Sequence, residues 1–169
     1  MIKVLIVDDH SLVRLGIRRL LEDVSGIKVV GEADSGEQAL KFVRDNLVDV
    51  VLLDVKMPGI GGLEATKRIV RASPDVKVIA VTAFHDDPFP SRVLQAGASG
   101  YLTKECGFEE MVSAIKKVST GQRYISPEIA QQLALRSLTE ASADASPFES
   151  LSERELQVMI MITSGYKVQ

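Results

Sequence analysis

The sequence predicts an α/β fold in which helices cover both faces of a doubly wound parallel sheet. Short aliphatic segments, such as residues 2–7 and 49–53, alternate with stretches whose apolar residues recur at helical spacing, and the alternation continues to about residue 120. Strands that are buried on both faces of a parallel sheet read as continuous Val/Ile/Leu runs. The connections between segments are short, which is typical of repeated β–α units in a compact domain.

Five strands and five helices are expected in strict alternation, a (βα)5 arrangement. The strands are predicted near residues 2–7, 27–32, 49–53, 76–81 and 100–102. The helices are predicted over residues 11–22, 35–46, 62–71, 89–96 and 108–119. Helical spacing is clearest in the first helix, with leucine or isoleucine at positions 12, 15, 17, 20 and 21. Ser11 and Ser35 are the expected N-caps, and Gly97 and Gly121 stand where glycine ends a helix.

The character of the chain changes after Gly121. Ser126-Pro127-Glu128 is expected to begin another helix, which fades into a small, polar and acidic stretch over residues 139–147, typical of a linker. The capping box Ser152-Glu153-Arg154-Glu155 then starts a new amphipathic helix. One such helix cannot bury its own apolar stripe, so we expect the chain to stop inside a second domain.

Composition narrows the class of protein. The 169 residues, 46% of them hydrophobic, suffice for one core and a remainder. No apolar run approaches the roughly 18 residues that a membrane span needs, and no signal peptide is seen, so a cytoplasmic protein without membrane contact is expected. Cys106 is the only cysteine, which excludes an internal disulfide. The net charge of −3 gives the chain as a whole no basic field for nucleic acid.

Three carboxylates stand where two predicted strands end. Asp8 and Asp9 follow the first strand, and Asp54 follows the third. Ligands of open α/β sheets bind outside the carboxyl ends of the strands, so these acids are expected to converge if the two strands are neighbours. Like charges held close raise one another's pKa unless a cation neutralises them, and oxygen ligands favour Mg²⁺. The sequence therefore predicts a magnesium site.

Further polar side chains follow the remaining strands. Thr82 ends the fourth strand, and Lys104 follows the fifth, three residues after Tyr101. A hydroxyl and an ammonium facing carboxylates and a metal suit phosphoryl transfer, in which catalysis is mostly positioning and charge stabilisation. Asp54 is the predicted nucleophile, forming an aspartyl phosphate.

These residues, with Met57-Pro58-Gly59 after Asp54, resemble the receiver domain of bacterial two-component response regulators over residues 1–120. The tail Leu151-Ser152-Glu153-Arg154-Glu155 resembles the opening helix of a LuxR-type helix-turn-helix domain, as in the NarL/FixJ class. Residues 59–66 and 121–125 are most similar to the GacA/UvrY group of global activators. The resemblance implies a CheY-like, flavodoxin-like receiver over residues 1–121, a helix and linker over 122–150, and a truncated DNA-binding domain over 151–169.

The resemblance also implies roles and partners. Asp54 would accept a phosphoryl group from a sensor histidine kinase or phosphotransfer domain and undergo slow autodephosphorylation. Mg²⁺ would be held by Asp9, Asp54 and the main-chain carbonyl of Lys56, with Asp8 acting through water. Lys104 would pair with the phosphoryl group, while Thr82 and Tyr101 would form the conformational switch. Homodimerisation on phosphorylation is possible, and promoter DNA is a partner only for a full-length form.

Other interpretations stay open but are weaker. A phosphatase of the haloacid-dehalogenase type needs a second acid two residues after its nucleophile, and Lys56 stands there. A phosphorylation-independent interaction domain would not need Asp54 and Lys104. If the strand geometry persists beyond the first strand, His10 points the opposite way from Asp9. His10 and His85 are both expected to be loop residues. Glu105 follows Lys104 where the family commonly has a proline, often in a cis peptide, which leaves the local backbone open.

Overall fold

The computed structural model describes residues 1–83 and 89–144. The chain divides into two compact units, Met1–Ile129 and Ala130–Gln169. The helix expected from residue 152 and the last part of the predicted linker lie outside the described residues. No helix within the described ranges is long and apolar enough to cross a membrane.

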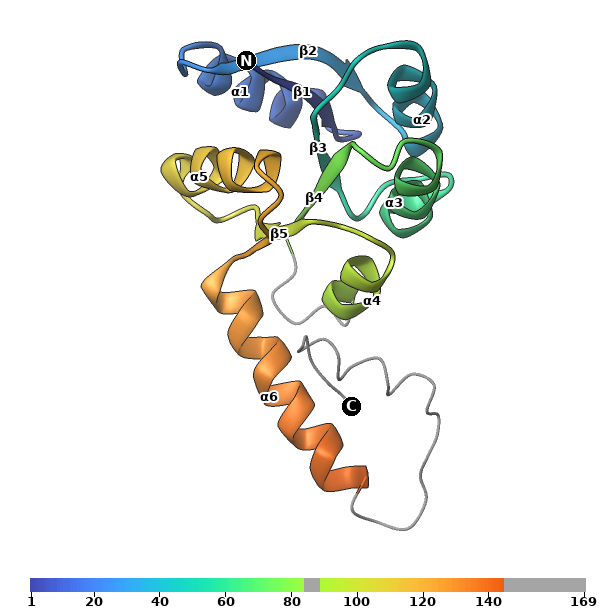
Figure 1. Ribbon diagram of the computed structural model, residues 1–169, viewed down its shortest axis with the longest axis vertical. Coiled ribbons are helices and arrows are strands. Elements are labelled where there is room, and N and C mark those ends of the chain that lie inside the picture. The colour runs from blue at the N-terminus through green and yellow to red at the C-terminus, as the bar shows by residue number, and fades with distance from the viewer. Residues whose placement is uncertain (84–88, 145–169) are drawn as a thin grey trace. The chain divides into compact units, whose positions relative to one another are not determined.

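The first unit is built on a six-stranded parallel sheet with the order β2-β1-β3-β4-β5-β6 (Figure 1). The strands are β1 Ile2–Val7, β2 Ile27–Ala33, β3 Val50–Asp54, β4 Lys77–Thr82, β5 Gly100–Thr103 and β6 Tyr124–Ile125. The helices are α1 Ser11–Glu22, α2 Gly36–Asp45, α3 Gly61–Ala72, α4 Phe89–Gln95, α5 Phe108–Ser119 and α6 Pro127–Asp144. The predicted doubly wound α/β fold is confirmed, and the five strands and five helices predicted between residues 2 and 119 are present within one or two residues of their expected bounds.

The two faces of the sheet carry separate hydrophobic cores because side chains alternate along each strand. In β1, Val4 and Ile6 pack on the face that α1 and α5 cover, together with Leu21 and Ile115. Leu5 and its neighbours on the other face pack against α2 and α3. A strand buried on both faces must be aliphatic at every position, which explains the runs in the sequence.

The prediction of five strands was wrong, because β6 adds a sixth at the outer edge of β5. Its register places Gly100 beside Tyr124 and Tyr101 beside Ile125. The amide of Ser126 then donates to the carbonyl of Tyr101 at 2.9 Å. A two-residue strand carries no periodicity in the sequence, and it forms only because the edge of β5 offers unpaired backbone groups.

Helix ends partly follow the predicted caps. Ser35 accepts from the amide of Gln38 at 3.1 Å, as expected of an N-cap. Ser11 is not the N-cap of α1, since His10 holds that position and makes no side-chain cap bond. Gly97 and Gly121 have φ values of 114° and 96°, which favour glycine and confirm their predicted positions.

In α1, whose helical spacing predicted a helix, the leucines at positions 12, 15 and 20 are exposed and Leu21 is fully buried. One further expectation needs correction. The helix after Ser126 continues to Asp144, so the first part of the stretch predicted as linker is helical. Ile129, near the start of this helix, is fully buried.

Gly62 provides a test of the close packing beside β3. A Cβ at this position would lie 2.6 Å from Val55 Cα and 2.8 Å from the carbonyl oxygen of Asp54. Because these are backbone atoms that cannot turn aside, we expect Gly62→Ala to lower the free energy of unfolding by about 1–3 kcal/mol. Urea unfolding followed by circular dichroism measures this change.

Gly16 is the matched control, since it lies within α1 and no heavy atom stands within 4 Å of its would-be Cβ. Gly16→Ala should stabilise the chain by about 0.5–1 kcal/mol through helix propensity. Equal effects of the two substitutions would contradict the assigned packing.

Candidate functional site

The site lies at the carboxyl edge of the sheet, where β1, β3, β4 and β5 end next to one another. Asp8 follows β1, Asp54 is the last residue of β3, and Thr82 is the last residue of β4. The parallel register brings Leu53 beside Val7 and Thr82 beside Thr103, so neighbouring strands end at the same level. The side chains predicted from separate parts of the sequence are therefore placed at one edge.

A single ammonium group links the carboxylates. Lys104 Nζ lies 3.2 Å from Asp8 Oδ2 and 3.5 Å from Asp54 Oδ2. Both aspartate side chains are 4% exposed, whereas that of Lys104 is 24% exposed. The backbone amide of Lys104 donates to the carbonyl of Thr82 at 2.6 Å, which fixes the start of the loop after β5. Lys104, which follows β5, thus forms ion pairs with carboxylates at the ends of β1 and β3.

The charges at the site are not balanced. Burial raises the pKa of Asp54 to about 6, and the negative charge of Asp8 adds to the rise, although Lys104 and the amide of Lys56 oppose it. Burial acts to lower the pKa of Lys104, but the carboxylates of Asp54 and Asp8 outweigh it and leave this pKa above its ordinary value. Lys104 therefore stays charged, and its one positive charge does not compensate for the carboxylates around it.

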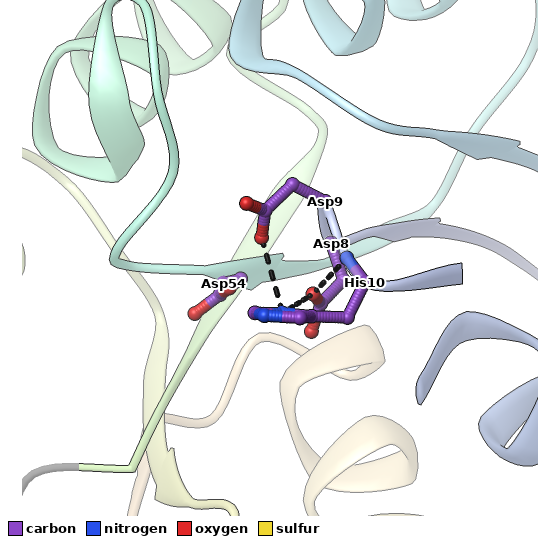
Figure 2. Close-up of side chains that lie close together, drawn as sticks. All are labelled: Asp8, Asp9, His10 and Asp54. Atoms are coloured by element: carbon purple, nitrogen blue, oxygen red, sulfur yellow. Dashed lines mark hydrogen bonds and ion pairs between the residues drawn. The ribbon is translucent and has the colours of Figure 1, made fainter. Parts of the chain in front are cut away.

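The three acids come together as predicted. Oxygen atoms of Asp8, Asp9 and Asp54 and a ring nitrogen of His10 all lie within 4.8 Å of one another (Figure 2). Asp54 also accepts from the backbone amide of Lys56 at 3.3 Å. A hollow of about 320 Å³ opens beside this cluster, and its lining consists of His10, Asp54, Lys56, Met57, Pro58, Ala83 and Lys104. The arrangement can receive a small charged group from solvent.

The other two predicted site residues, Thr82 and Tyr101, are buried. Thr82 is 1% exposed and Tyr101 is fully buried. Every peptide bond in the described residues is trans, including the one between Lys104 and Glu105, so the expected family proline is not needed for the placement of Lys104.

His10 lies outside the helices and strands, as expected, but its ring does not point away from Asp9. Its Nδ1 lies 3.0 Å from Asp8 Oδ1 and 3.2 Å from Asp9 Oδ1, so the ring turns toward the acids instead of away from them (Figure 2). The cause is local: Asp8 Oδ1 accepts the backbone amide of His10 at 2.8 Å, and the turn breaks the strand alternation on which the expectation rested. An aspartate side chain commonly accepts the backbone amide two residues later, so the position of Asp8 two residues before His10 was the signal in the sequence.

Comparison with known proteins defines the class. Residues 4–116 match the family described as response regulator receiver domain. The chain is 62% identical over 169 residues to Response regulator GacA of Pseudomonas aeruginosa, covering 100% of this chain and 78% of that protein. It is 61% identical over 168 residues to Response regulator UvrY of Escherichia coli, covering 99% of this chain and 77% of that protein.

Solved structures agree. A crystal structure of a LuxR-family two-component response regulator from an Aurantimonas species has a TM-score of 0.77 and 38% identity, covering 80% of this chain and 97% of that one. The isolated REC domain of RcsB from Salmonella enterica, in the presence of phosphomimetic BeF3⁻, has a TM-score of 0.71 and 26% identity, covering 77% of this chain and 96% of that one.

The chain therefore belongs to the response regulator family of two-component systems, whose receiver domains are phosphoacceptor switches. Within this family its likeness to GacA and UvrY, and to LuxR-family structures, assigns it to the GacA/UvrY type of transcription-controlling regulators.

The raised pKa of Asp54 has a consequence for stability in the metal-free chain. A carboxyl whose folded pKa of about 6 exceeds its ordinary value of 3.8 opposes folding above pH 6, and this opposition fades as the pH falls from 6 toward 4. Asp54→Asn removes the charge, so we expect it to raise the free energy of unfolding by about 1–3 kcal/mol at pH 7.5. The gain over wild type should shrink on acidification through pH 6. Urea unfolding in chelator at several pH values measures it.

The control is Asp45→Asn, because the Asp45 side chain is 61% exposed and pairs with Lys41 only at 3.6 Å. Its effect should stay within about 0.5 kcal/mol at all pH values. An Asp54→Asn variant that is less stable than wild type at pH 7.5 would contradict the charge imbalance.

Proposed function

We propose that Asp54 accepts a phosphoryl group from a sensor histidine kinase or a phosphotransfer domain, with Mg²⁺ bound at the same site, and that the receiver then changes conformation. The observation that carries this proposal is the placement of Asp54, a buried carboxylate beside the hollow with a lysine at 3.5 Å and two further acids within reach.

The transfer step is a displacement at phosphorus. An oxygen of the Asp54 carboxylate attacks, an O–P bond forms as the P–N bond of a phosphohistidine breaks, and the imidazole nitrogen keeps the bonding electron pair. The attacking atom needs the charged carboxylate, and the pKa of about 6 leaves Asp54 mostly ionised at neutral pH. Lys104, now between Asp8 and Asp54, is within reach of the oxygens of the incoming group.

A divalent cation fits the residues present. Three carboxylates gather at one place, only two of them are paired with Lys104, and burial together with the negative charge of Asp8 raises the pKa of Asp54. Asp9, Asp54 and the main-chain carbonyl of Lys56 would hold Mg²⁺, with Asp8 acting through water. When bound, Mg²⁺ supplies charge stabilisation for the phosphoryl oxygens.

Hydrolysis of the aspartyl phosphate, which returns the site to its starting state, is expected to be slow. Attack of water on the aspartyl phosphate would restore the Asp54 carboxylate and release inorganic phosphate. A phosphatase with an aspartate nucleophile keeps an acid two residues later, and this chain has Lys56 there, with an exposed side chain. The site is thus suited to holding the phosphoryl group, and the haloacid-dehalogenase alternative remains the weaker proposal.

The output is proposed to be transcriptional control through a LuxR-type DNA-binding domain. Residues 1–121 would be the receiver, 122–150 the helix and linker, and 151–169 the start of the DNA-binding domain. RcsB, a relative of known structure, has been solved as dimers bound to DNA. By analogy, phosphorylation would promote pairing of two copies, and promoter DNA would be bound by a form with a complete output domain.

Phosphorylation of Asp54 can be measured directly. After incubation with acetyl phosphate and Mg²⁺, wild-type protein should show a slower band on a Phos-tag gel, and Asp54→Asn should show none, because the nucleophilic oxygen pair is gone. Asp45→Asn, which changes an exposed aspartate, should label like wild type. A shifted band that persists in Asp54→Asn would overturn the assignment of the acceptor.

The proposed switch makes a separate prediction for Tyr101. Its side chain is fully buried here, so a switch requires a second, outward position in the unphosphorylated chain. With fluorotyrosine incorporated, the Tyr101 resonance, identified by its loss in Tyr101→Phe, should show two environments in ¹⁹F spectra. Acetyl phosphate with Mg²⁺ should shift their populations toward the buried one, and Thr82→Val should reduce that shift while Asp54 is still labelled.

The Tyr124 resonance is the internal reference, since its hydroxyl donates to Glu110 at 2.6 Å. A single Tyr101 environment that phosphorylation leaves unchanged would contradict the switch.

A further inference from the structure

His10 adds a nitrogen donor to the acidic cluster. Its Nδ1 faces Asp8 Oδ1 at 3.0 Å and Asp9 Oδ1 at 3.2 Å (Figure 2). Asp8 Oδ1 also accepts the His10 backbone amide at 2.8 Å, and Lys104 Nζ occupies the other oxygen of Asp8. The His10 side chain is 64% exposed, so an ion can reach it from solvent.

These distances suit a shared metal ion as well as a hydrogen bond. Ligand atoms bound at about 2.0–2.1 Å lie about 3.0 Å apart at right angles and about 3.3 Å apart in a tetrahedron. The separation of Nδ1 from Asp9 Oδ1, 3.2 Å, falls in this range, and Asp9 is one of the carboxylates proposed to hold Mg²⁺ directly. One ligand atom from each of Asp8, Asp9, His10 and Asp54 lies within 4.8 Å of the others. The backbone turn at Asp8 holds the ring in this position before any ion arrives.

A nitrogen donor changes which ions the cluster prefers. Carboxylates alone suit Mg²⁺, whereas imidazole suits zinc, copper and nickel, and affinity of mixed sites rises along the first-row series toward copper. We propose that His10 Nδ1 is a metal ligand and that it makes this site a binding site for transition-metal ions, with Zn²⁺ competing with Mg²⁺ for the same carboxylates. This inference rests on the metal site of the proposed function and adds the class of ion that the site takes.

NMR observation of the histidine ring nitrogens tests directly whether His10 Nδ1 binds the metal ion. The chain has two histidines, His10 and His85, so long-range ¹H–¹⁵N spectra of untagged, histidine-labelled protein contain few signals. Addition of Zn²⁺ should displace the Nδ1 resonance of His10 and leave its Nε2 as the protonated nitrogen, and Asp9→Asn should weaken the effect. An unchanged His10 Nδ1 at saturating Zn²⁺ would overturn the inference.

Calorimetric titrations then separate a ligand from a merely structural contact. His10→Phe keeps a flat aromatic ring and removes the nitrogen donor, and we expect it to raise the Kd for Zn²⁺ by about 10–100-fold. The Kd for Mg²⁺ should change by no more than about threefold, because carboxylate oxygens dominate its binding. Asp45→Asn, which changes an exposed carboxylate paired with Lys41, is the control and should leave both constants unchanged. Equal changes for both ions in His10→Phe would mean that His10 only shapes the acidic cluster, and would overturn the inference.

The same preparations distinguish this inference from the proposed function. Wild-type protein that is labelled on Asp54 by acetyl phosphate and Mg²⁺, but whose His10 Nδ1 ignores Zn²⁺, would refute the nitrogen ligand alone. Protein that binds Zn²⁺ through His10 but is never labelled would refute the phosphoacceptor assignment alone.

Discussion

The site depends on the ammonium group of Lys104, which is shared by two buried carboxylates. Asp8 and Asp54 come from adjacent strands and are both nearly inaccessible to water. Two such charges side by side are tolerated only with a cation between them, so a chain without the Lys104 ammonium would hold two uncompensated buried carboxylates. Lys104 supplies that cation from the end of β5, so the arrangement of three strand ends relies on one side chain. Its single charge faces two carboxylates, and burial, with the negative charge of Asp8 adding to it, keeps the pKa of Asp54 raised.

The sequence was sufficient for the sheet and for most of the site, because both follow from rules that act over long stretches. Parallel strands must be aliphatic throughout, and their carboxyl ends must share one edge, so Asp54, Thr82 and Lys104 could be brought together without knowing a single contact. The two features that were not predicted, the direction of the His10 ring and the strand β6, each depend on a few local hydrogen bonds. The ring of His10 turns inward because one oxygen of Asp8 accepts the His10 amide. Likewise, β6 exists only because the edge of β5 is available to pair with it.

β5 connects the site to the segment that follows α5. At its end, the amide of Lys104 donates to the carbonyl of Thr82 in β4. Within it, Tyr101 is buried, and its carbonyl accepts from Ser126, directly before α6 begins. Gly100 permits this pairing, since a Cβ there would lie 3.0 Å from the carbonyl oxygen of Tyr124. Backbone hydrogen bonds therefore join β5 directly to residues 124–126.

Because Lys104 is shared by two carboxylates, the proposed phosphorylation would rearrange the ion pairs at the site. Once an oxygen of Asp54 is bonded to phosphorus, the local negative charge increases and moves outward from the strand end toward the hollow. Lys104 is held by Asp8 and Asp54 in the unphosphorylated chain, so a new and stronger partner beyond Asp54 would draw its ammonium away from Asp8. A divalent cation and the phosphoryl group would favour each other's binding by the same factor, because coupling between ligands is reciprocal. A site whose acids were fully matched by fixed lysines would accept the same group with little rearrangement. On this proposal, the shortage of positive charge would make this edge of the sheet responsive to phosphorylation.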